Sequence, residues 1–263
     1  MQNQQPSTLK EIRVHGTQDF PCAFYQTGTR IRGNMVKHHW HEEVELLYFS
    51  GGEFCLEINM ERFEISEECF YFINPGELHS ISVEKNGGCV ENAVVFHMDM
   101  LSSAYALDQI QTNLIQPVQN GSIQFPRCLR KNEPAFEPVR KSYEEIRNVF
   151  GGDSFRENYY DGEAVTDDIT RQLFIKSALL RILAVLSANN LFEVTEKNHD
   201  RRIETIKTTL TYIQENYKEK IYIRDLADLI GMNEQYFCRF FKKVIGRSPM
   251  EYVNEYRIKK AIH

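Results

Sequence analysis

The 263-residue sequence predicts an α+β protein of more than one domain: a small β-barrel or sandwich, then a helical segment, then an all-helical domain. Three observations predict this order. Short runs rich in β-branched and aromatic residues fill residues 21–100. Beyond residue 100, apolar residues recur at spacings of three and four. The charge also divides, because residues 1–200 carry a net charge of -11 and residues 201–263 a net charge of +5.

The composition excludes several classes of protein. No run of about 18 apolar residues occurs, which excludes a membrane-spanning helix. The first ten residues are polar and Gln-rich, unlike a secretory signal, so we expect a cytoplasmic protein with no membrane partner. The six cysteines form no C-x-x-C pair, which favours small core residues over a disulfide scaffold or a cysteine zinc site.

Residues 1–20 are expected to form an N-terminal arm, and residues 21–100 a barrel. The arm either senses a ligand or is a disordered tail. In the barrel region, turns rich in Gly, Asn and Pro separate short runs with the composition of strands. The predicted strands are Cys22–Gln26, Glu43–Phe49, Phe54–Ile58, Phe63–Ile65, Cys69–Ile73, Leu78–Val83 and Val90–Met98.

Residues 101–191 are predicted to be a helical linker and dimerisation segment. Helical periodicity covers Glu133–Phe150 and Asp167–Asn189. The apolar face predicted for the second helix consists of Ile169, Leu173, Phe174, Ala178, Ile182, Val185 and Leu186. Such a face must be buried, so we expect this helix to form a homodimer; the alternative is that it only covers the barrel.

The polar stretch 192–202 is predicted to be an interdomain linker, and residues 203–263 a domain of short helices. The four helices expected there are Ile203–Tyr217, Ile223–Ile230, Glu234–Val244 and Pro249–His263.

A group of histidines and one glutamate is the main chemical feature of the barrel region. His39, His41 and Glu45 share parity, so on one continuous strand their side chains would emerge from the same face. His79 follows the turn at Pro75-Gly76 and could lie beside them. Such a set can hold a divalent metal with one position open. The alternative is that these side chains hydrogen-bond one another or an organic ligand. His38 and His97 are expected to be structural.

The spacing Gly33-x5-His39-x-His41-x3-Glu45-x6-Gly52 resembles the first motif of the cupin barrel. Gly76-x2-His79 resembles part of the second motif, which departs from the pattern at Pro75 and Val83. The resemblance implies a cupin-like barrel with a ligand pocket. No cofactor is required, and a divalent metal at His39, His41, Glu45 and His79 stays open.

Residues 223–246 predict two short helices around a tight turn. Ala227 is small where the helices would cross, Gly231 suits a positive φ in the turn, and Asn233 can cap the second helix. The core stripe predicted in that helix is Phe237, Phe240, Phe241 and Val244. Its opposite face offers Gln235, Tyr236, Cys238, Arg239, Lys242 and Lys243. Gln and Arg suit base edges, whereas lysines and Arg247 suit phosphates.

This segment resembles the first helix-turn-helix of the AraC/XylS family of bacterial transcription regulators. The residues that match the family signature are Phe241-Lys242-Lys243, Gly246-Arg247-Ser248-Pro249, Tyr252 and Arg257-Ile258-Lys259-Lys260-Ala261. The resemblance implies base contacts at Gln235, Cys238 and Arg239, with Asn233 and Tyr236 nearby. Tyr222 departs from the small hydroxyl residue usual before the first helix. A cupin-like barrel followed by helices and this domain is also the family's usual architecture.

The resemblance therefore implies a ligand-responsive transcription regulator rather than an enzyme. Its effector would be a small molecule, most often a sugar in this family, bound by His39, His41, Glu45, Tyr71 and His79. Its other partners would be DNA and a second copy of the chain. Family members carry a second helix-turn-helix beyond the position where this sequence ends, so we expect this chain to bind DNA weakly. The alternatives are a metal-dependent cupin enzyme, an isomerase or oxygenase with a helical appendix, and an adaptor without DNA binding.

Overall fold

The computed structural model describes residues 10–11, 13–29, 33–83, 89–105, 107–151, 160–161, 168–195 and 201–261. Residues 1–9 of the predicted arm and residues 196–200 of the predicted linker lie outside this set. The chain divides into a larger unit built mainly on residues 14–197 and a smaller unit built mainly on residues 198–263. None of the helices in the described part of the chain is long and apolar enough to cross a membrane.

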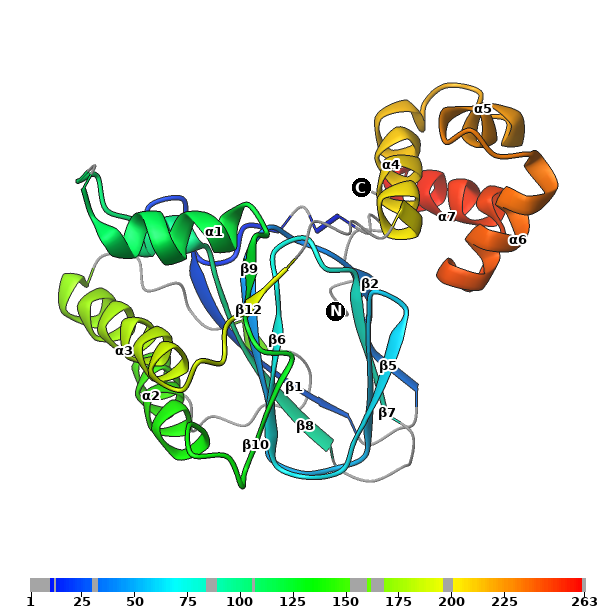
Figure 1. Cartoon of the computed structure of the whole chain (residues 1–263). Helices are drawn as coiled ribbons and strands as arrows, with labels where there is room; N and C mark the ends of the chain where they lie inside the picture. Colours follow the sequence, from blue (N-terminus) through cyan, green and yellow to red (C-terminus); the bar gives the residue numbers. More distant parts are fainter. Residues whose placement is uncertain are drawn as a thin grey trace. The chain divides into compact units, whose positions relative to one another are not determined.

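Two antiparallel sheets form the larger unit (Figure 1). The first has the order β10-β6-β3-β8-β1-β11, with β1 Cys22–Thr29, β3 Val44–Phe49, β6 Cys69–Ile73, β8 Cys89–Phe96, β10 Cys128–Arg130 and β11 Tyr160–Asp161. The second has the order β2-β7-β4-β5, with β2 Gly33–His39, β4 Phe54–Ile58, β5 Glu61–Ile65 and β7 His79–Val83. A small separate pair joins β9 Ile123–Gln124 to β12 Glu193–Val194. The predicted β-sandwich or barrel is confirmed as two facing sheets.

Each predicted strand has a counterpart, but one interpretation was wrong. His39, His41 and Glu45 do not share a continuous strand, because β2 ends at His39 and β3 begins only at Val44. The chain passes from the four-stranded sheet to the six-stranded sheet between them. Alternation of side chains within one strand therefore cannot be what aligns these three residues.

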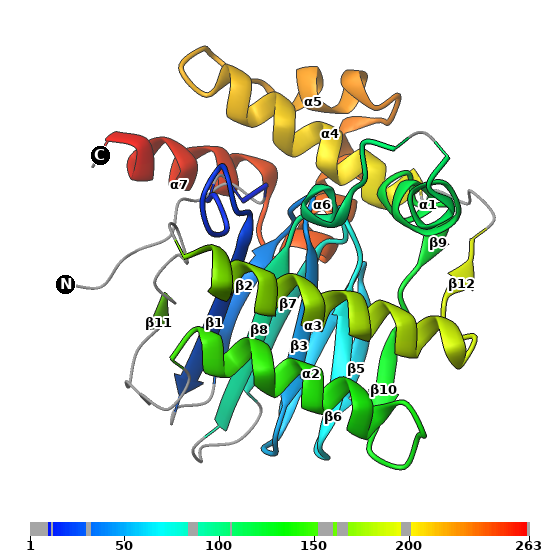
Figure 2. The ribbon, with the colours of Figure 1, turned by 90° about the vertical axis from the view of Figure 1, so that its left-hand side faces the viewer.

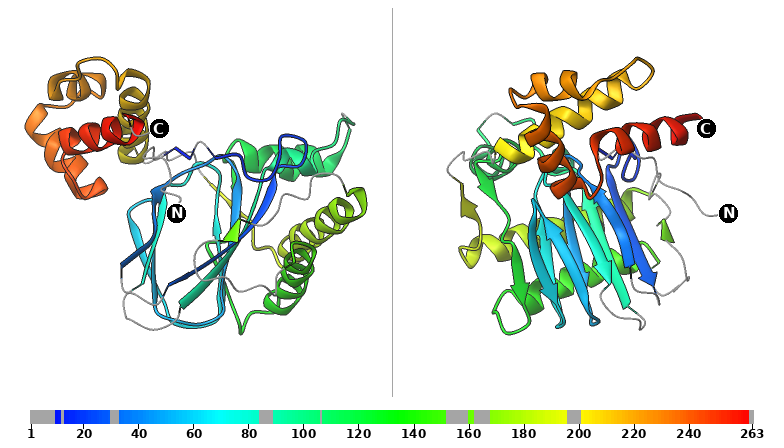
Figure 3. Two further views of the ribbon diagram at one scale, coloured as in Figure 1. Left: turned by 180° about the vertical axis from the view of Figure 1, so that it is seen from behind. Right: turned by 90° about the vertical axis from the view of Figure 1, so that its right-hand side faces the viewer.

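After strand β8, most of the remaining chain of the larger unit forms helices. A 3-10 turn Met98–Leu101, a π-helical turn Gln111–Ile115 and α1 Gln116–Gln119 lead to α2 Phe136–Val149 and α3 Ile169–Ala188. The carboxylate of Asp168 caps α3 by accepting the backbone N–H of Thr170 at 2.9 Å. In Figure 2, α2 and α3 lie across the outer face of the six-stranded sheet. The left view of Figure 3 shows the order of layers from behind: helices, six-stranded sheet, four-stranded sheet.

The six-stranded sheet is buried on both faces, as its strand β3 shows. Leu46 and Tyr48 point into a core shared with α2 and α3. Leu47 and Phe49 point the other way, into a core shared with the four-stranded sheet. All six residues of β3 are buried, which explains why this strand is a continuous apolar run with one exception, Glu45.

The prediction of which residues form the buried face of α3 was wrong in part. The residues that α3 buries are Ile175, Ala178, Leu179, Ile182, Leu183 and Leu186. Ile169, Leu173 and Phe174, which were assigned to that face, are instead 73%, 62% and 58% exposed. The helix carries apolar residues around most of its circumference, so the sequence pattern does not single out the buried side.

The smaller unit consists of α4 Arg201–Asn216, α5 Ile223–Leu229, α6 Glu234–Ile245 and α7 Pro249–Ala261. Helix α4 begins inside the stretch predicted as linker. Phe237 and Phe241 of α6 are fully buried, and their rings meet at 5.6 Å between centroids. Gly231 in the turn and Gly246 after α6 adopt φ of 66° and 79°, the left-handed region that favours glycine.

Candidate functional site

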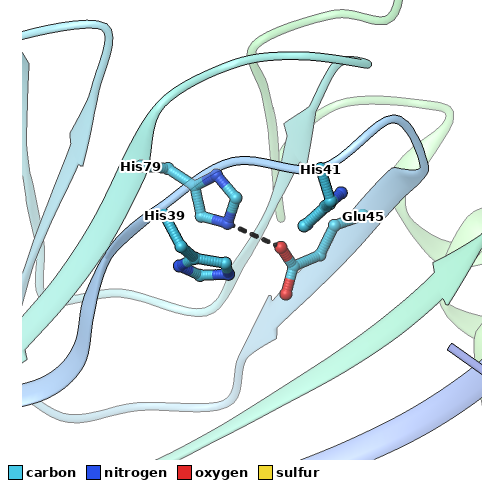
Figure 4. A group of neighbouring side chains, drawn as sticks. All are labelled: His39, His41, Glu45 and His79. Atoms are coloured by element: carbon cyan, nitrogen blue, oxygen red, sulfur yellow. Dashed lines mark ion pairs between the residues drawn. The ribbon is translucent and has the colours of Figure 1, made fainter. Parts of the chain in front are cut away.

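Four polar side chains gather where β2, β3 and β7 meet: His39, His41, Glu45 and His79 (Figure 4). His39 is the last residue of β2, and His79 is the first residue of β7, which belongs to the same sheet. Glu45 comes from β3 of the facing sheet. Their nitrogen and oxygen atoms all lie within 4.8 Å of one another. The structure thus brings together all four residues predicted as metal ligands.

The ring of His79 lies between a backbone carbonyl and a carboxylate. Its Nδ1 lies 2.9 Å from the carbonyl oxygen of Glu77, and because a carbonyl can only accept, Nδ1 carries the hydrogen. This leaves Nε2 directed at Glu45, whose Oε2 is 2.9 Å away. The ring is 1% exposed, so its orientation is fixed by these contacts rather than by solvent.

Arg127 supports the loop that precedes His79. Its guanidinium binds the Glu77 carboxylate, with Nη1 2.7 Å from Oε2, and also donates to the carbonyl of Phe72 at 2.9 Å. Asn59 adds a hydrogen bond to the same carboxylate at 3.0 Å. These bonds hold the backbone carbonyl of Glu77 that orients His79. No pattern in the sequence marks Arg127 as a partner of Glu77, because the two residues lie 50 positions apart in the chain.

The N-terminal segment contributes to the same place. Glu11 Oε2 lies 3.4 Å from His39 Nε2, and the backbone N–H of Glu11 donates to the carbonyl of Trp40 at 2.9 Å. Glu11, His15 and His41 form a second group whose ligand atoms lie within 4.8 Å of one another. Glu11 and His15 belong to the predicted arm, where no spacing pattern marked them.

The donor set of the four residues fits a divalent metal. Three imidazole nitrogens and one carboxylate oxygen suit zinc, iron or manganese. The Nδ1 hydrogen bond from His79 to a backbone carbonyl is the usual outer support of an imidazole ligand. Buried hydrogen-bonding groups of this kind equally suit the hydroxyls of an organic ligand.

Glu91 is a further acid inside the barrel that the sequence analysis missed. It lies on β8 opposite Phe49 and on the same face as Ala93 and Val95, which line the core between the sheets. Its side chain is buried, and the oxygen Oε1 has no hydrogen-bond partner among the described residues. Burial raises the pKa of Glu91 well above its usual range, and the nearby charge of Glu45 raises it further.

Tyr71 lies in the same interior but outside the group of four. It faces Leu47 on β3, two residues from Glu45, which corresponds to about 7 Å along the strand. Its ring packs against Phe49 and Phe63. His97, expected to be structural, caps the 3-10 turn by accepting the backbone N–H of Asp99 at 3.2 Å.

Helix α6 presents the residues predicted to contact DNA. The side chain of Asn233 caps the helix by accepting the backbone N–H of Tyr236 at 2.8 Å, as predicted. The exposed predicted residues are Asn233, Gln235, Tyr236, Arg239, Lys242 and Lys243. Cys238 and Arg247 are half-buried. Exposed amide and guanidinium groups on a capped helix can reach base edges, and the lysines can reach phosphates.

The packing of α6 differs from the prediction at one position. Phe240, assigned to the core stripe, is only half-buried and stacks on Tyr236 with 6.5 Å between ring centroids. Ile245 is buried in addition to Val244. Tyr222 at the start of α5 donates its backbone N–H to Asp225 at 3.0 Å, so one orphan donor is satisfied without a small hydroxyl residue.

Arg257 joins α7 to the end of α4. Its Nε donates to the carbonyl of Tyr217 at 2.8 Å, and a terminal nitrogen binds the carbonyl of Glu219. A cation at a helix C-terminus also interacts favourably with the helix dipole. This signature residue therefore has a structural role.

Two family models match the chain. Residues 24–147 match the AraC-like ligand binding domain, and residues 213–254 match the bacterial regulatory helix-turn-helix proteins of the AraC family. The first match covers most of both sheets and α2. The second covers α5 and α6 with parts of α4 and α7.

Several curated proteins are similar over most of their length. An uncharacterized HTH-type transcriptional regulator, YdeC of Bacillus subtilis, is 27% identical over 97% of this chain and 81% of its own. The HTH-type transcriptional activator RhaS of Citrobacter koseri is 23% identical over 89% of this chain and 75% of its own. The melibiose operon regulatory protein of Escherichia coli is 23% identical over 85% and 69%.

Among solved structures, ToxT from Vibrio cholerae aligns with 92% of this chain and 82% of its own at 12% identity and a TM-score of 0.38. A cupin protein from Bacteroides fragilis aligns with 33% and 75% at 16% identity and a TM-score of 0.28.

We expect the substitution Glu91→Gln to stabilise the protein at neutral pH. The raised pKa means that the folded chain keeps a proton which the unfolded chain releases above about pH 4.5. The stability of the wild type therefore falls as pH rises from there, by up to about 1.4 kcal/mol per pH unit, until the folded-state pKa is reached. Glutamine keeps the shape of the side chain and cannot ionise.

Urea unfolding of both proteins at about pH 5 and about pH 7.5 measures this difference. The gain in stability should be larger at the higher pH. Glu64→Gln, at an exposed position of β5, is the matched control and should change stability little at either pH. A loss of stability at both pH values in Glu91→Gln would contradict a neutral, buried Glu91.

Proposed function

We propose that this chain, an AraC-family transcription regulator with an AraC-like ligand-binding domain, changes its DNA binding when a small molecule enters that domain. The observation that carries the proposal is the presence of both matched domains in one chain. Opposite net charges on the two parts fit a division between a sensor and a DNA-binding unit. A ligand can act in this way only if it binds one arrangement of the protein more tightly than the other.

The effector that the site supports best is a sugar. His39, His41, Glu45 and His79 offer convergent donors and acceptors that suit several hydroxyl groups. Tyr71 and its aromatic neighbours supply an apolar surface of the kind on which a sugar ring packs. One of the similar proteins is named as a regulator of the melibiose operon.

A divalent metal held by the same four residues would be a second component of this site. It would supply a positive charge toward which ligand oxygens orient. His79 would keep its Nδ1 hydrogen bond to Glu77, and Arg127 would hold that loop in place. A metal-dependent cupin enzyme remains the rival function, which turnover by the metal-loaded protein would establish.

Glu11 supports a role for the N-terminal arm in sensing. Its carboxylate lies beside His39, and the backbone at Lys10 forms a bridge with Trp40. A ligand or metal that takes up His39 would compete with Glu11 for the imidazole. Binding would thereby weaken the ion pair between Glu11 of the arm and His39.

Thermal unfolding with a panel of sugars that includes melibiose tests the effector proposal. A bound sugar at about 100 times its dissociation constant should add about 2.7 kcal/mol to the stability. Glu45→Gln should abolish the stabilisation, and Glu64→Gln, exposed on β5, should retain it. Repeating the series after dialysis against a chelator, with metal analysis, shows whether a metal contributes. A stabilisation that survives Glu45→Gln would place the pocket elsewhere.

The DNA contacts are proposed for α6. Arg239→Ala should weaken binding by about 1–3 kcal/mol and relax sequence preference at one base pair, as expected for a guanidinium that bonds a base edge. Lys243→Ala, on an exposed lysine of the same helix, should weaken binding to all sequences alike and reduce its salt dependence. Electrophoretic mobility shifts measure both effects, with DNA fragments that the wild-type protein selects from a genomic library. Uniform loss in Arg239→Ala would make Arg239 a phosphate contact instead.

A second copy of the chain is proposed to cover the exposed side of α3. Ile169, Leu173 and Leu180 follow one stripe of the helix and are 73%, 62% and 43% exposed, with Phe174 beside them at 58%. Exposed apolar residues grouped in this way mark an interaction surface.

Leu173→Asp should convert a dimer into a monomer, because burying a carboxylate in an apolar interface is unfavourable. Analytical ultracentrifugation measures the change. Leu107→Asp is the control, since Leu107 is 75% exposed but lies outside α3, and it should leave the dimer intact. A monomeric wild type, or a dimer unaffected by Leu173→Asp, would contradict this interface.

A further inference from the structure

Two cysteine side chains meet on neighbouring strands of the six-stranded sheet. In the pairing of β6 with β10, Cys69 lies opposite Arg130 and Cys128 lies opposite Tyr71. Residues two apart on a strand share a face, so all four side chains stand on one face as diagonal neighbours. The two thiol groups are close enough for each to change the pKa of the other.

The two thiols differ in exposure. Cys69 is 6% exposed and belongs to the core between the sheets, whereas Cys128 is half-buried and only packs against that core. Strand β10 is three residues long and forms one edge of the sheet, so it has a sheet neighbour on one side only. Because Cys128 is only half-buried and lies on an edge strand, a small reagent can reach its thiol.

Three groups stabilise the thiolate of Cys128. The Cys69 thiol donates a hydrogen bond to it, the Tyr71 hydroxyl donates a second, and the guanidinium of Arg130 adds a positive charge and a hydrogen bond. Together they lower the pKa of Cys128 to about 7, against the opposing effect of burial. The same hydrogen bond and burial raise the pKa of Cys69 far above its usual value. Near neutral pH, therefore, a thiolate lies beside a protonated thiol.

We propose that Cys128 and Cys69 form an oxidation site for hydroperoxides, in which Cys128 is the reacting thiolate and Cys69 the thiol that completes a disulfide. The site is distinct from the group of four residues around Glu45. Cys69 faces Phe49, four residues along β3 from Glu45, or about 14 Å. The inference does not depend on the proposed effector.

The chemistry needs only the hydroperoxide. The Cys128 sulfur attacks one peroxide oxygen, an S–O bond forms, the O–O bond breaks, and the leaving alkoxide takes a proton from water to become an alcohol. Cys128 is now a sulfenic acid, oxidised by two electrons. The Cys69 sulfur then attacks Cys128, an S–S bond forms, the S–O bond breaks, and hydroxide leaves with the Cys69 proton as water. Two thiols and one hydroperoxide give one disulfide, one alcohol and one water.

A disulfide here would fasten the edge strand to β6. Strand β10 leads through residues 131–135 into α2, which packs against α3. The bond would also remove the hydrogen bond from the Tyr71 hydroxyl to the thiolate. Oxidation would thus act on both the helical layer and the lining of the interior.

Alkylation of the whole chain across a range of pH tests the reactivity of Cys128. The half-buried Cys238 is the internal control, because burial and Glu234 raise its pKa. The rate at Cys128 should reach half its maximum near pH 7, while the rate at Cys238 still rises above about pH 9. Cys69→Ala, which removes a hydrogen-bond donor, should shift the Cys128 midpoint upward. Parallel pH profiles for Cys128 and Cys238 would overturn the assignment.

Treatment with hydrogen peroxide tests the second step, with peptide mass spectrometry as the readout. The wild type should give a peptide pair joined between Cys69 and Cys128. Cys69→Ala should stop at a sulfenic acid on Cys128 that dimedone traps, and Cys128→Ser should give neither product. Circular dichroism establishes that each variant is folded. No joined pair in the folded wild type, or equal oxidation of Cys238, would overturn the proposal.

Discussion

The double burial of strand β3 is the constraint on which the larger unit depends. Its alternate residues face two different cores, one shared with α2 and α3 and one shared with the four-stranded sheet. Burial of both faces is favourable because each side removes apolar area from water. The same strand carries Glu45, so the candidate ligand site and the helical layer are attached to one rigid element. Leu46, the next residue after Glu45, packs in the core shared with the helices behind the sheet.

Polar groups inside this apolar interior are stable only where each has a partner, and the unit supplies most of them from distant parts of the chain. Glu77 is held by Arg127, His79 lies between Glu77 and Glu45, and the Cys128 thiolate is surrounded by donors. Glu91 Oε1, like Asn74 Nδ2 and Tyr143 Oη, has no hydrogen-bond partner among the described residues, and burial favours the neutral form of Glu91.

The smaller unit is organised by helix caps and by a contact between two of its helices instead. Asn233 caps α6, Gly246 ends it in a left-handed conformation, and Arg257 ties α7 to the end of α4. Buried Phe237 and Phe241 fix which face of α6 is exposed. The exposed side chains of α6 are therefore those opposite the core stripe, which is why the helical period alone located nearly all of them.

The sequence by itself determined seven strands of the larger unit and the order of its β-rich and helical parts, because turn residues, alternation and spacing are local properties. It also marked His39, His41, Glu45 and His79 as a group, but it did not mark β2, the strand that His39 ends. Tertiary structure decided why these four meet: β2 and β3 lie in different sheets, and β7 brings His79 beside them. It also decided the partners Arg127, Glu11 and Glu91, and which side of α3 is exposed. Pairing between strands far apart in the chain, and the choice of one face of a helix that is apolar all round, depend on contacts that no local pattern encodes.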